Sequence, residues 1–495
     1  MKNRMRRFAE IIIVVLVVIA AIYIRIVLLV NTDDFHGISA GKILLAKSII
    51  NRTLPWQWYP VVHPPVHLTM IIFGLNLYHN PLIISRLISL FFAGFSFFFY
   101  YYYVRGIFDS KTAFFSIVSV ALYSEHIVYS VIGTPETMFH AMLFLGLFYW
   151  ILFLEKGKSK FLYVSAIAIG IASLTRYEGL LFIPFILFFL RKQRKKAVLF
   201  FASAFLFPVI WMTLNYLFRG NAFLFLSTND FNVPLQFNWM RSKGINIDFV
   251  YKLLFWPRIM MKTLGWPMFV SGIGGIILCL FKKKKMFPTM LFLVLFIIFI
   301  LRTLQEKLYL QPRYSITLGL MLMPFSIFFA LRIMKLINKR WLTWCVFLLI
   351  WTMIPCIGER VISAPLYAPN FAKNIAKYIK NNIIEDENII MDHCGDERYK
   401  EPIKLLSGLN PRQFILKPYQ VVKSGRWVAD KEKFFEVVEE EKVRILIYSP
   451  LGDLGNVLGL EKKGSPAMIK GYSFDLQYEN DPYFVYRLRK INDEL

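Results

Sequence analysis

The first residues of this 495-residue chain that could carry out chemistry are two adjacent carboxylates, Asp33 and Asp34, directly after a long apolar run. Two neighbouring negative charges repel each other, and such a pair suits a general base or a metal ligand at a membrane surface. Aspartate is also a favoured N-cap residue, so a helix cap before the helix expected at 38–50 explains the pair as well. The pair therefore predicts a general base, a metal ligand or a helix cap.

The same loop, 31–81, contains His63 and His67, which have the four-residue spacing of a metal-binding pair. Pro64 and Pro65 favour a helix that begins after His63, so the two rings lose their common helix face. We therefore expect an interfacial helix over 67–78, which is too short to cross a bilayer. We keep His63 among the expected substrate-binding residues. The sequence establishes no cofactor, and a divalent metal is the one candidate.

Two later apolar runs begin with a charged residue. Glu136 follows a proline, and a carboxylate next to apolar sequence is costly unless it faces a cavity or a partner. Stabilisation by the helix dipole is the alternative explanation for Glu136. Arg313 and Tyr314 open a late run, where the arginine either binds an anion or extends to the membrane interface. Arg25, late in the first run, has the same two explanations, and we expect it to extend to the interface.

A polar break separates two apolar half-runs at Arg176, Tyr177 and Glu178. Residues two apart do not share a helix face, so the break is expected to be non-helical. The planar fork of Arg176 can bind a phosphate. An ion pair between Arg176 and Glu178 that closes the loop is the structural alternative.

Composition places these residues in a membrane protein. Hydrophobic residues make up 57% of the chain and charged residues only 18%, whereas a soluble chain has about 45–50% and about 25%. The net charge of +26 lies entirely in the first 358 residues, because the tail from 359 holds 21 basic and 21 acidic residues. This excess lies between apolar runs rather than on one soluble face, so the chain is not expected to bind nucleic acid. The four cysteines predict no disulfide framework.

Eleven apolar runs predict a polytopic α-helical membrane protein with about 11 transmembrane helices. They lie at 11–24, 82–104, 112–124, 137–154, 161–175, 179–190, 197–218, 263–281, 286–301, 314–331 and 341–357. Alternate connectors are short and basic, which places them and the N-terminus in the cytoplasm by the positive-inside rule. The acidic connectors, including loop 31–81, and the tail then lie outside the cell membrane.

The tail, 359–495, is expected to be a soluble extracytoplasmic α/β domain after a transmembrane domain of 1–358. Its pattern predicts helices at 371–380 and 431–442, strands at 388–391 and 444–448, and a hairpin over 474–488. Its glycines match no phosphate-binding fingerprint, so its role cannot be read from the sequence.

In these motifs the chain resembles the GT-C membrane glycosyltransferases. The resemblance is to the branch of the protein O-mannosyltransferases and the lipid A aminoarabinose transferases. It rests on four features in order: the acidic pair at Asp33, Pro64-Pro65 before an interfacial helix, Glu136 opening a span, and Arg313-Tyr314 opening a late span.

The resemblance implies transfer of one sugar from a polyprenyl-phosphate donor to an acceptor hydroxyl of a protein, lipid or glycan on the outer face. It makes Asp33, or its neighbour Asp34, the base and gives Glu136 an assisting role. Arg176, Tyr177, Glu178, Arg313 and Tyr314 are the expected substrate-binding residues. A Trp-Trp-Asp motif, typical of oligosaccharyltransferases, is absent from the sequence.

Two other classes of protein remain open. A secondary transporter would need interrupted repeats and charges near the midplane of the membrane, whereas the charges here gather at one surface. A protein that binds or assembles lipid-linked glycans without catalysis would keep its function after the carboxylates are replaced.

Overall fold

The computed structural model describes residues 2–33, 36–52, 64–282, 285–333, 348–364, 366–383, 387–392, 397–415, 419–421, 427–449, 453–458, 460, 467–481 and 483–491. The chain divides into two compact units, which we describe separately. Unit 1 contains Met1–Thr32 and Gln57–Ala364, and unit 2 contains Asp33–Trp56 and Pro365–Leu495. The domain boundary expected between 358 and 359 stays a prediction. The structure adds that the start of the first loop groups with the tail.

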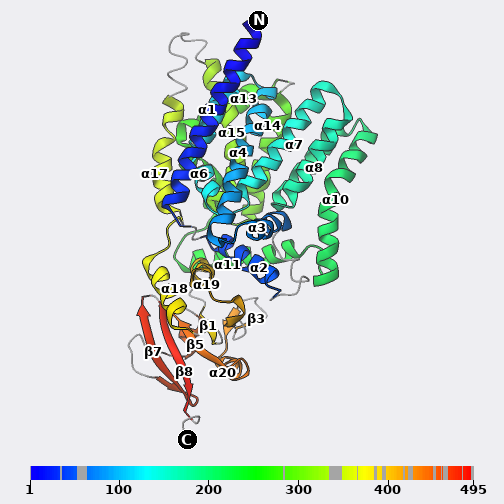
Figure 1. Ribbon diagram of the computed structural model, residues 1–495. Coiled ribbons are helices and arrows are strands. Elements are labelled where there is room, and N and C mark those ends of the chain that lie inside the picture. Colours follow the sequence, from blue (N-terminus) through cyan, green and yellow to red (C-terminus); the bar gives the residue numbers. More distant parts are fainter. Residues whose placement is uncertain are drawn as a thin grey trace. The chain divides into compact units, whose positions relative to one another are not determined.

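Unit 1 is helical throughout its described part (Figure 1). Its helices are α1 (Lys2–Asn31), α3 (Pro65–Leu77), α4 (Pro81–Ile107), α5 (Ser110–Ala121), α6 (Ser124–Val131), α7 (Glu136–Lys156), α8 (Ser159–Ser173), η2 (Tyr177–Leu181), α9 (Phe182–Leu190), α10 (Arg194–Arg219), α11 (Leu224–Ser242), α12 (Phe249–Leu264), α13 (Trp266–Leu280), α14 (Met286–Leu304), η4 (Pro312–Tyr314), α15 (Ser315–Ile333) and α17 (Ile354–Ser363).

Six helices of unit 1 are long and apolar enough to cross a membrane, namely α1, α4, α7, α10, α14 and the segment Pro312–Arg332 that contains α15. Two bent pairs, α5 with α6 and α12 with α13, raise this number to as many as eight. The described residues thus confirm a polytopic helical membrane protein. The predicted spans 161–175 and 179–190 form shorter apolar helices, and part of the span predicted at 341–357 lies outside the described residues.

Short side chains and prolines set where these helices begin and how closely they pack. Pro65 is the first residue of α3 and Pro64 is its N-cap, as the sequence predicts. Asn80 caps α4 by accepting a hydrogen bond from the Leu82 amide. Gly275 of α13 lies against the backbone of α15 at Phe325, where a Cβ atom would collide with the carbonyl. The helices α7, α8 and α10 lie side by side in sequence order (Figure 1).

The bent pair of α5 and α6 contains a correction to the expectation for Arg25. Its side chain is fully buried and does not extend to the interface. Its guanidinium donates hydrogen bonds to the carbonyls of Ala121 and Val120, at 3.2 and 3.4 Å, where α5 ends and the chain turns by 58°. A cation at the C-terminus of a helix is favoured by the helix dipole. The end of α5 therefore provides a partner for the Arg25 guanidinium, which the sequence does not reveal.

Unit 2 is an α/β unit. Its elements are α2 (Gly37–Ile50), α18 (Asn370–Asn382), β1 (Asn388–Met391), α19 (Glu397–Ser407), η6 (Pro411–Gln413), β2 (Phe414–Ile415), β3 (Tyr419–Val421), β4 (Trp427–Ala429), α20 (Lys431–Glu440), β5 (Val443–Tyr448), α21 (Asp453–Leu458), β6 (Ala467–Ile469), β7 (Tyr472–Asn480) and β8 (Tyr483–Lys490).

The main sheet of unit 2 has the order β2-β1-β5-β8-β7-β6. β1 pairs in parallel with β2 and β5, and the long strands β7 and β8 form an antiparallel hairpin (Figure 1). The predicted helices, strands and hairpin of the tail are confirmed to within a few residues. One core lies between the sheet and α18, where Ile375 and Ile379 are fully buried, and a second core contains Phe434 of α20.

Candidate functional site

A buried ionic cluster in unit 1 joins three residues that the sequence analysis selected. Glu136 is the first residue of α7 and only 1% of its side chain is exposed. Arg176, at the end of α8, forms an ion pair with Glu136 through Nη1 and a second one with Glu178 through Nη2, at 2.6 Å. Since helices α7 and α8 are antiparallel neighbours, the start of one and the end of the other meet at the same end of the bundle.

Arg176 is held from two sides by negative charge. Burial lowers the pKa of its guanidinium, but the charges of Glu178 and Glu136 outweigh burial and raise that pKa. The side chain is 11% exposed, and its Nε also donates to Glu178, at 3.3 Å. For Arg176 the sequence allows a phosphate ligand or a structural ion pair. The geometry contains the ion pair and extends it to Glu136.

Arg313 and Tyr314 complete this cluster from η4, the turn before α15. The Arg313 guanidinium lies 3.9 Å from Oε1 of Glu136, and its Nη2 lies 3.4 Å from the hydroxyl of Tyr314. The Tyr314 ring lies under both guanidinium groups, with its centroid 5.0 Å from Cζ of Arg176 and 5.1 Å from Cζ of Arg313. Within the described residues, Nε of Arg313 is buried without a hydrogen-bond partner. Nε of Arg313 is therefore open to a ligand, whereas Nε of Arg176 donates to Glu178.

Tyr177 faces other partners in unit 1. Its ring stacks on Phe225 of α11, with 3.8 Å between centroids and 17° between planes. Its hydroxyl accepts a hydrogen bond from Nε1 of Trp211, at 3.2 Å. Gly179 makes the polar break compact, because a Cβ atom there would lie 2.6 Å from the amide nitrogen of Ser173. Tyr177 thus anchors the break that carries Arg176.

A second buried ion pair, which the sequence analysis did not identify, joins α6 to α17. Glu125 is fully buried, and Nε of Arg360 lies 2.6 Å from its Oε1. The Arg360 guanidinium also lies over the ring of Tyr129, with 6.0 Å from Cζ to the centroid. Helix α6 packs against α7 and η4, so the two ion pairs belong to one neighbourhood. Glu125 directly follows the apolar run 112–124, but nothing in the sequence links it to Arg360.

Asp33 is described within unit 2. Its side chain is 44% exposed, and Oδ2 pairs with Nζ of Lys373 on α18, at 2.6 Å. The same oxygen accepts a hydrogen bond from the Ala368 amide, at 3.4 Å. The N-cap of α2 is His36, so Asp33 does not cap that helix. The expected site residues Asp34 and His63 lie outside the described residues.

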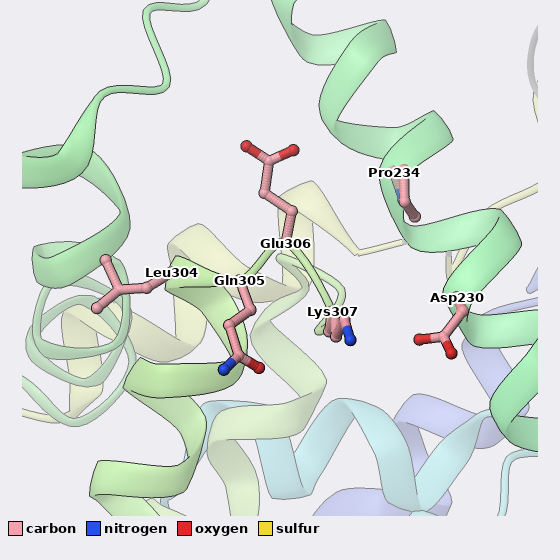
Figure 2. Close-up of a pocket in the computed structure, with 6 residues that line it drawn as sticks. All are labelled: Asp230, Pro234, Leu304, Gln305, Glu306 and Lys307. Carbon is pink, nitrogen blue, oxygen red and sulfur yellow. The ribbon is translucent and has the colours of Figure 1, made fainter.

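An open pocket of about 590 Å³ lies in unit 1 between α11 and the end of α14 (Figure 2). Asp230 and Pro234 line it on one side, and residues 304–307 line it on the other. Glu306 adopts a left-handed backbone conformation, with φ of 54°. Burial raises the pKa of the Glu306 carboxyl, but hydrogen bonds from Lys252 and Arg241 outweigh burial and lower it. These two cations hold the loop that borders the pocket.

No group of three or more potential metal ligands occurs among the described residues. Asp33 faces the ammonium group of Lys373, which is unfavourable for a metal ion at that carboxylate. The described residues therefore do not fit a divalent metal site.

Comparisons with known proteins place this fold. Residues 62–217 match the family described as dolichyl-phosphate-mannose-protein mannosyltransferase. No curated protein matches the chain in sequence. The structure of ArnT from Cupriavidus metallidurans bound to undecaprenyl phosphate is similar, with a TM-score of 0.62 and 11% identity over 96% of this chain and 97% of that chain.

A second similar structure is that of the archaeal oligosaccharyltransferase AglB from Archaeoglobus fulgidus, in complex with an inhibitory peptide and a dolichol-phosphate. Its TM-score is 0.60, with 13% identity over 90% of this chain and 70% of that chain. The fold is therefore that of the GT-C membrane glycosyltransferases. The resemblance that the sequence motifs suggested is confirmed, and the matched segment includes Glu136 and Arg176.

Proposed function

We propose that this protein is a membrane glycosyltransferase that moves one sugar from a polyprenyl-phosphate donor to an acceptor hydroxyl, with inversion at the sugar carbon. The observation that carries the proposal is the buried cluster of Glu136, Arg176, Glu178, Arg313 and Tyr314. Carboxylates and arginines are costly inside a membrane protein and mark substrate sites there. The matched mannosyltransferase segment and the lipid phosphates bound in the two similar structures support the same substrate class.

Arg313 is the group that we assign to the donor phosphate. Its side chain is 11% exposed, and its contacts to Glu136 and Tyr314 are long. Its Nε has no hydrogen-bond partner among the described residues. A planar fork with open donors can bind phosphate oxygens in pairs. Arg176 adds positive charge, but its short ion pairs to Glu136 and Glu178 give it mainly the role of holding the cluster together.

Asp33, or its neighbour Asp34, is the proposed base. In the transfer step the acceptor oxygen attacks the anomeric carbon while its proton passes to the carboxylate. The bond between that carbon and the phosphate oxygen breaks, and the lipid phosphate leaves with the electron pair. Arg313 stabilises the negative charge that grows on the phosphate. Glu136 assists by holding the guanidinium groups of Arg313 and Arg176 in position through its ion pairs.

The proposed reaction takes place on the outer face of the cell membrane. The alternation of basic connectors supports a cytoplasmic N-terminus and an extracytoplasmic unit 2. The acceptor is a hydroxyl of a protein, a lipid or a glycan, and the missing Trp-Trp-Asp motif favours transfer of a single sugar over transfer of a whole glycan.

The test is sugar transfer by the purified protein in nanodiscs, with a panel of polyprenyl-phosphate monosaccharides and with Asp33→Asn and Asp34→Asn as variants. We expect one donor to turn over and one of the two variants to lose transfer while its thermal unfolding stays unchanged. Glu432→Gln, on the exposed part of α20, is a matched control that should keep full activity. Unchanged transfer in both aspartate variants would contradict the assignment of the base. No turnover of any donor by folded protein would favour a transporter or a binding protein.

A further inference from the structure

We propose that Arg86 is a positioning residue that fixes the start of the first loop, and through it the proposed base, for the transfer reaction. This inference rests on the proposed function. Arg86 lies in the second turn of α4, in a membrane-spanning helix, and is only 5% exposed. A buried arginine at such a position is costly, so its contacts indicate what it is retained for.

The Arg86 guanidinium binds two separate chain segments at once. Its Nη1 donates to the carbonyl of Thr32, at 2.8 Å, and its Nη2 donates to Oγ1 of the same residue, also at 2.8 Å. Its Nε donates to the carbonyl of Val131, at 2.7 Å, at the end of α6. Thr32 is the residue directly before Asp33, and Val131 lies five residues before Glu136. The three bonds use the fixed geometry of one planar group, which a lysine cannot reproduce.

Ser89, three residues further along α4, strengthens the second of these connections. Its hydroxyl donates to the carbonyl of Thr134, at 2.9 Å, and its own carbonyl accepts a hydrogen bond from Oγ1 of Thr137, at 2.7 Å. Thr134 and Thr137 lie on either side of Glu136. One face of α4 therefore holds both the chain that leads into Asp33 and the chain that carries Glu136.

Arg25 offers a matched control from the same region. It is also buried in a membrane-spanning helix, and it also donates to backbone carbonyls at the end of a helix, those of Val120 and Ala121. None of its described hydrogen bonds reaches Thr32 or residues 131–137. Arg25 and Arg86 both donate to carbonyls at helix ends in the bent pair of α5 and α6. Loss of either guanidinium therefore removes a hydrogen-bond donor from a buried helix end of this pair. Only loss of Arg86 releases the start of the first loop.

The expected effect appears in kcat. A displacement of a catalytic group by about 1 Å can cost on the order of 100-fold in rate, so Arg86→Gln should lower kcat by about 10- to 100-fold. The KM for the lipid donor should change by less than about threefold, because Arg313 and its contacts stay intact. Arg25→Gln should lower the thermal unfolding temperature to a similar extent and keep kcat within about threefold.

The experiment measures transfer kinetics and thermal unfolding in nanodiscs, with the donor that the wild type turns over. Arg86→Gln, Arg86→Lys and Arg25→Gln are each combined with the first-loop aspartate variant that impairs transfer. We expect Arg86→Gln to add little to the loss caused by the aspartate variant, whereas independent effects would multiply. If Arg86→Gln does not fold, Thr32→Val removes one of its three bonds, and Thr32→Ser keeps that bond. We expect Thr32→Val to lower kcat and Thr32→Ser to keep it.

The outcomes separate this inference from the proposed function. A wild type without transfer would overturn the proposed function and this inference with it. A transferring wild type would overturn the inference alone in two cases. In the first case, the kcat of Arg86→Gln equals that of the wild type or falls no further than the kcat of Arg25→Gln. In the second case, Thr32→Val and Thr32→Ser have the same kcat.

Discussion

The substitution Arg313→Gln tests which arginine of the buried cluster binds the donor phosphate. Among the described residues, Arg313 makes an ion pair with Glu136 at 3.9 Å and a hydrogen bond to Tyr314 at 3.4 Å. Both are too long to contribute much, so the substitution should change the free energy of unfolding by no more than about 1 kcal/mol. Glu136 keeps Arg176 as its partner in this variant.

The effect on donor binding should be much larger. Two hydrogen bonds from a guanidinium to a phosphate are worth about 1.5–3 kcal/mol each. Taking the lower value for both, Arg313→Gln should weaken donor binding by about 3 kcal/mol, which corresponds to a KM increase of about 150-fold. Arg176→Gln should behave in the opposite way. It leaves Glu136 and Glu178 without their short ion pairs, and breaking a buried pair costs about 3–5 kcal/mol of stability.

The assay combines initial rates over a range of donor concentrations with binding of the free polyprenyl phosphate and thermal unfolding in the same nanodiscs. Arg241→Gln is a suitable control, since this arginine pairs with Glu306 outside the cluster. Donor KM within about threefold of wild type in Arg313→Gln, together with a large increase in a well-folded Arg176→Gln, would refute the assignment. Arg176 would then be the phosphate ligand and Arg313 the structural residue.

Three further predictions concern other parts of unit 1. Glu125→Leu alone should destabilise the protein by about 3–5 kcal/mol, and the double variant with Arg360→Met should regain most of that loss in thermal unfolding. The pKa of Glu306 is lowered from its ordinary value of 4.5, so its contribution to stability is present above that pH and is lost as the pH falls through the lower value. The difference in unfolding temperature between wild type and Glu306→Gln should therefore disappear on acidification. Gly275→Val should separate α13 from α15 and reduce the yield of folded protein, as measured by size-exclusion chromatography in detergent.

Much of the fold follows from local patterns in the sequence. The paired prolines at Pro64 and Pro65 place the start of α3, because proline fits the first turn of a helix. The strands of unit 2 follow from short runs of β-branched and aromatic residues, and the hairpin predicted over 474–488 pairs Asn480 with Tyr483. Such features depend only on neighbours in the chain, so one sequence is enough to predict them.

The partners of the buried charges could not be predicted in the same way. Arg25 has the position of a residue that extends to the interface, yet its partners are carbonyls that become available only because α5 ends inside the bundle. Arg360 pairs with Glu125 across more than two hundred residues, and nothing local links the two. The sequence shows Arg86 as a charge within the apolar run 82–104, but its contact with Thr32 exists only once α1 and α4 are packed.

Five buried or largely buried arginines of unit 1 fall into two groups, and the difference bears on how an anionic lipid can bind. Arg25 and Arg86 donate to backbone carbonyls, so each of these groups has partners that carry no formal charge. Arg176, Arg313 and Arg360 face Glu136, Glu178 and Glu125, so these six charges sum to zero. A phosphate that enters this balanced set adds negative charge, and it is accommodated best where an existing contact is weakest. That contact is the 3.9 Å pair between Arg313 and Glu136, and its loss on binding would let the guanidinium turn towards the donor.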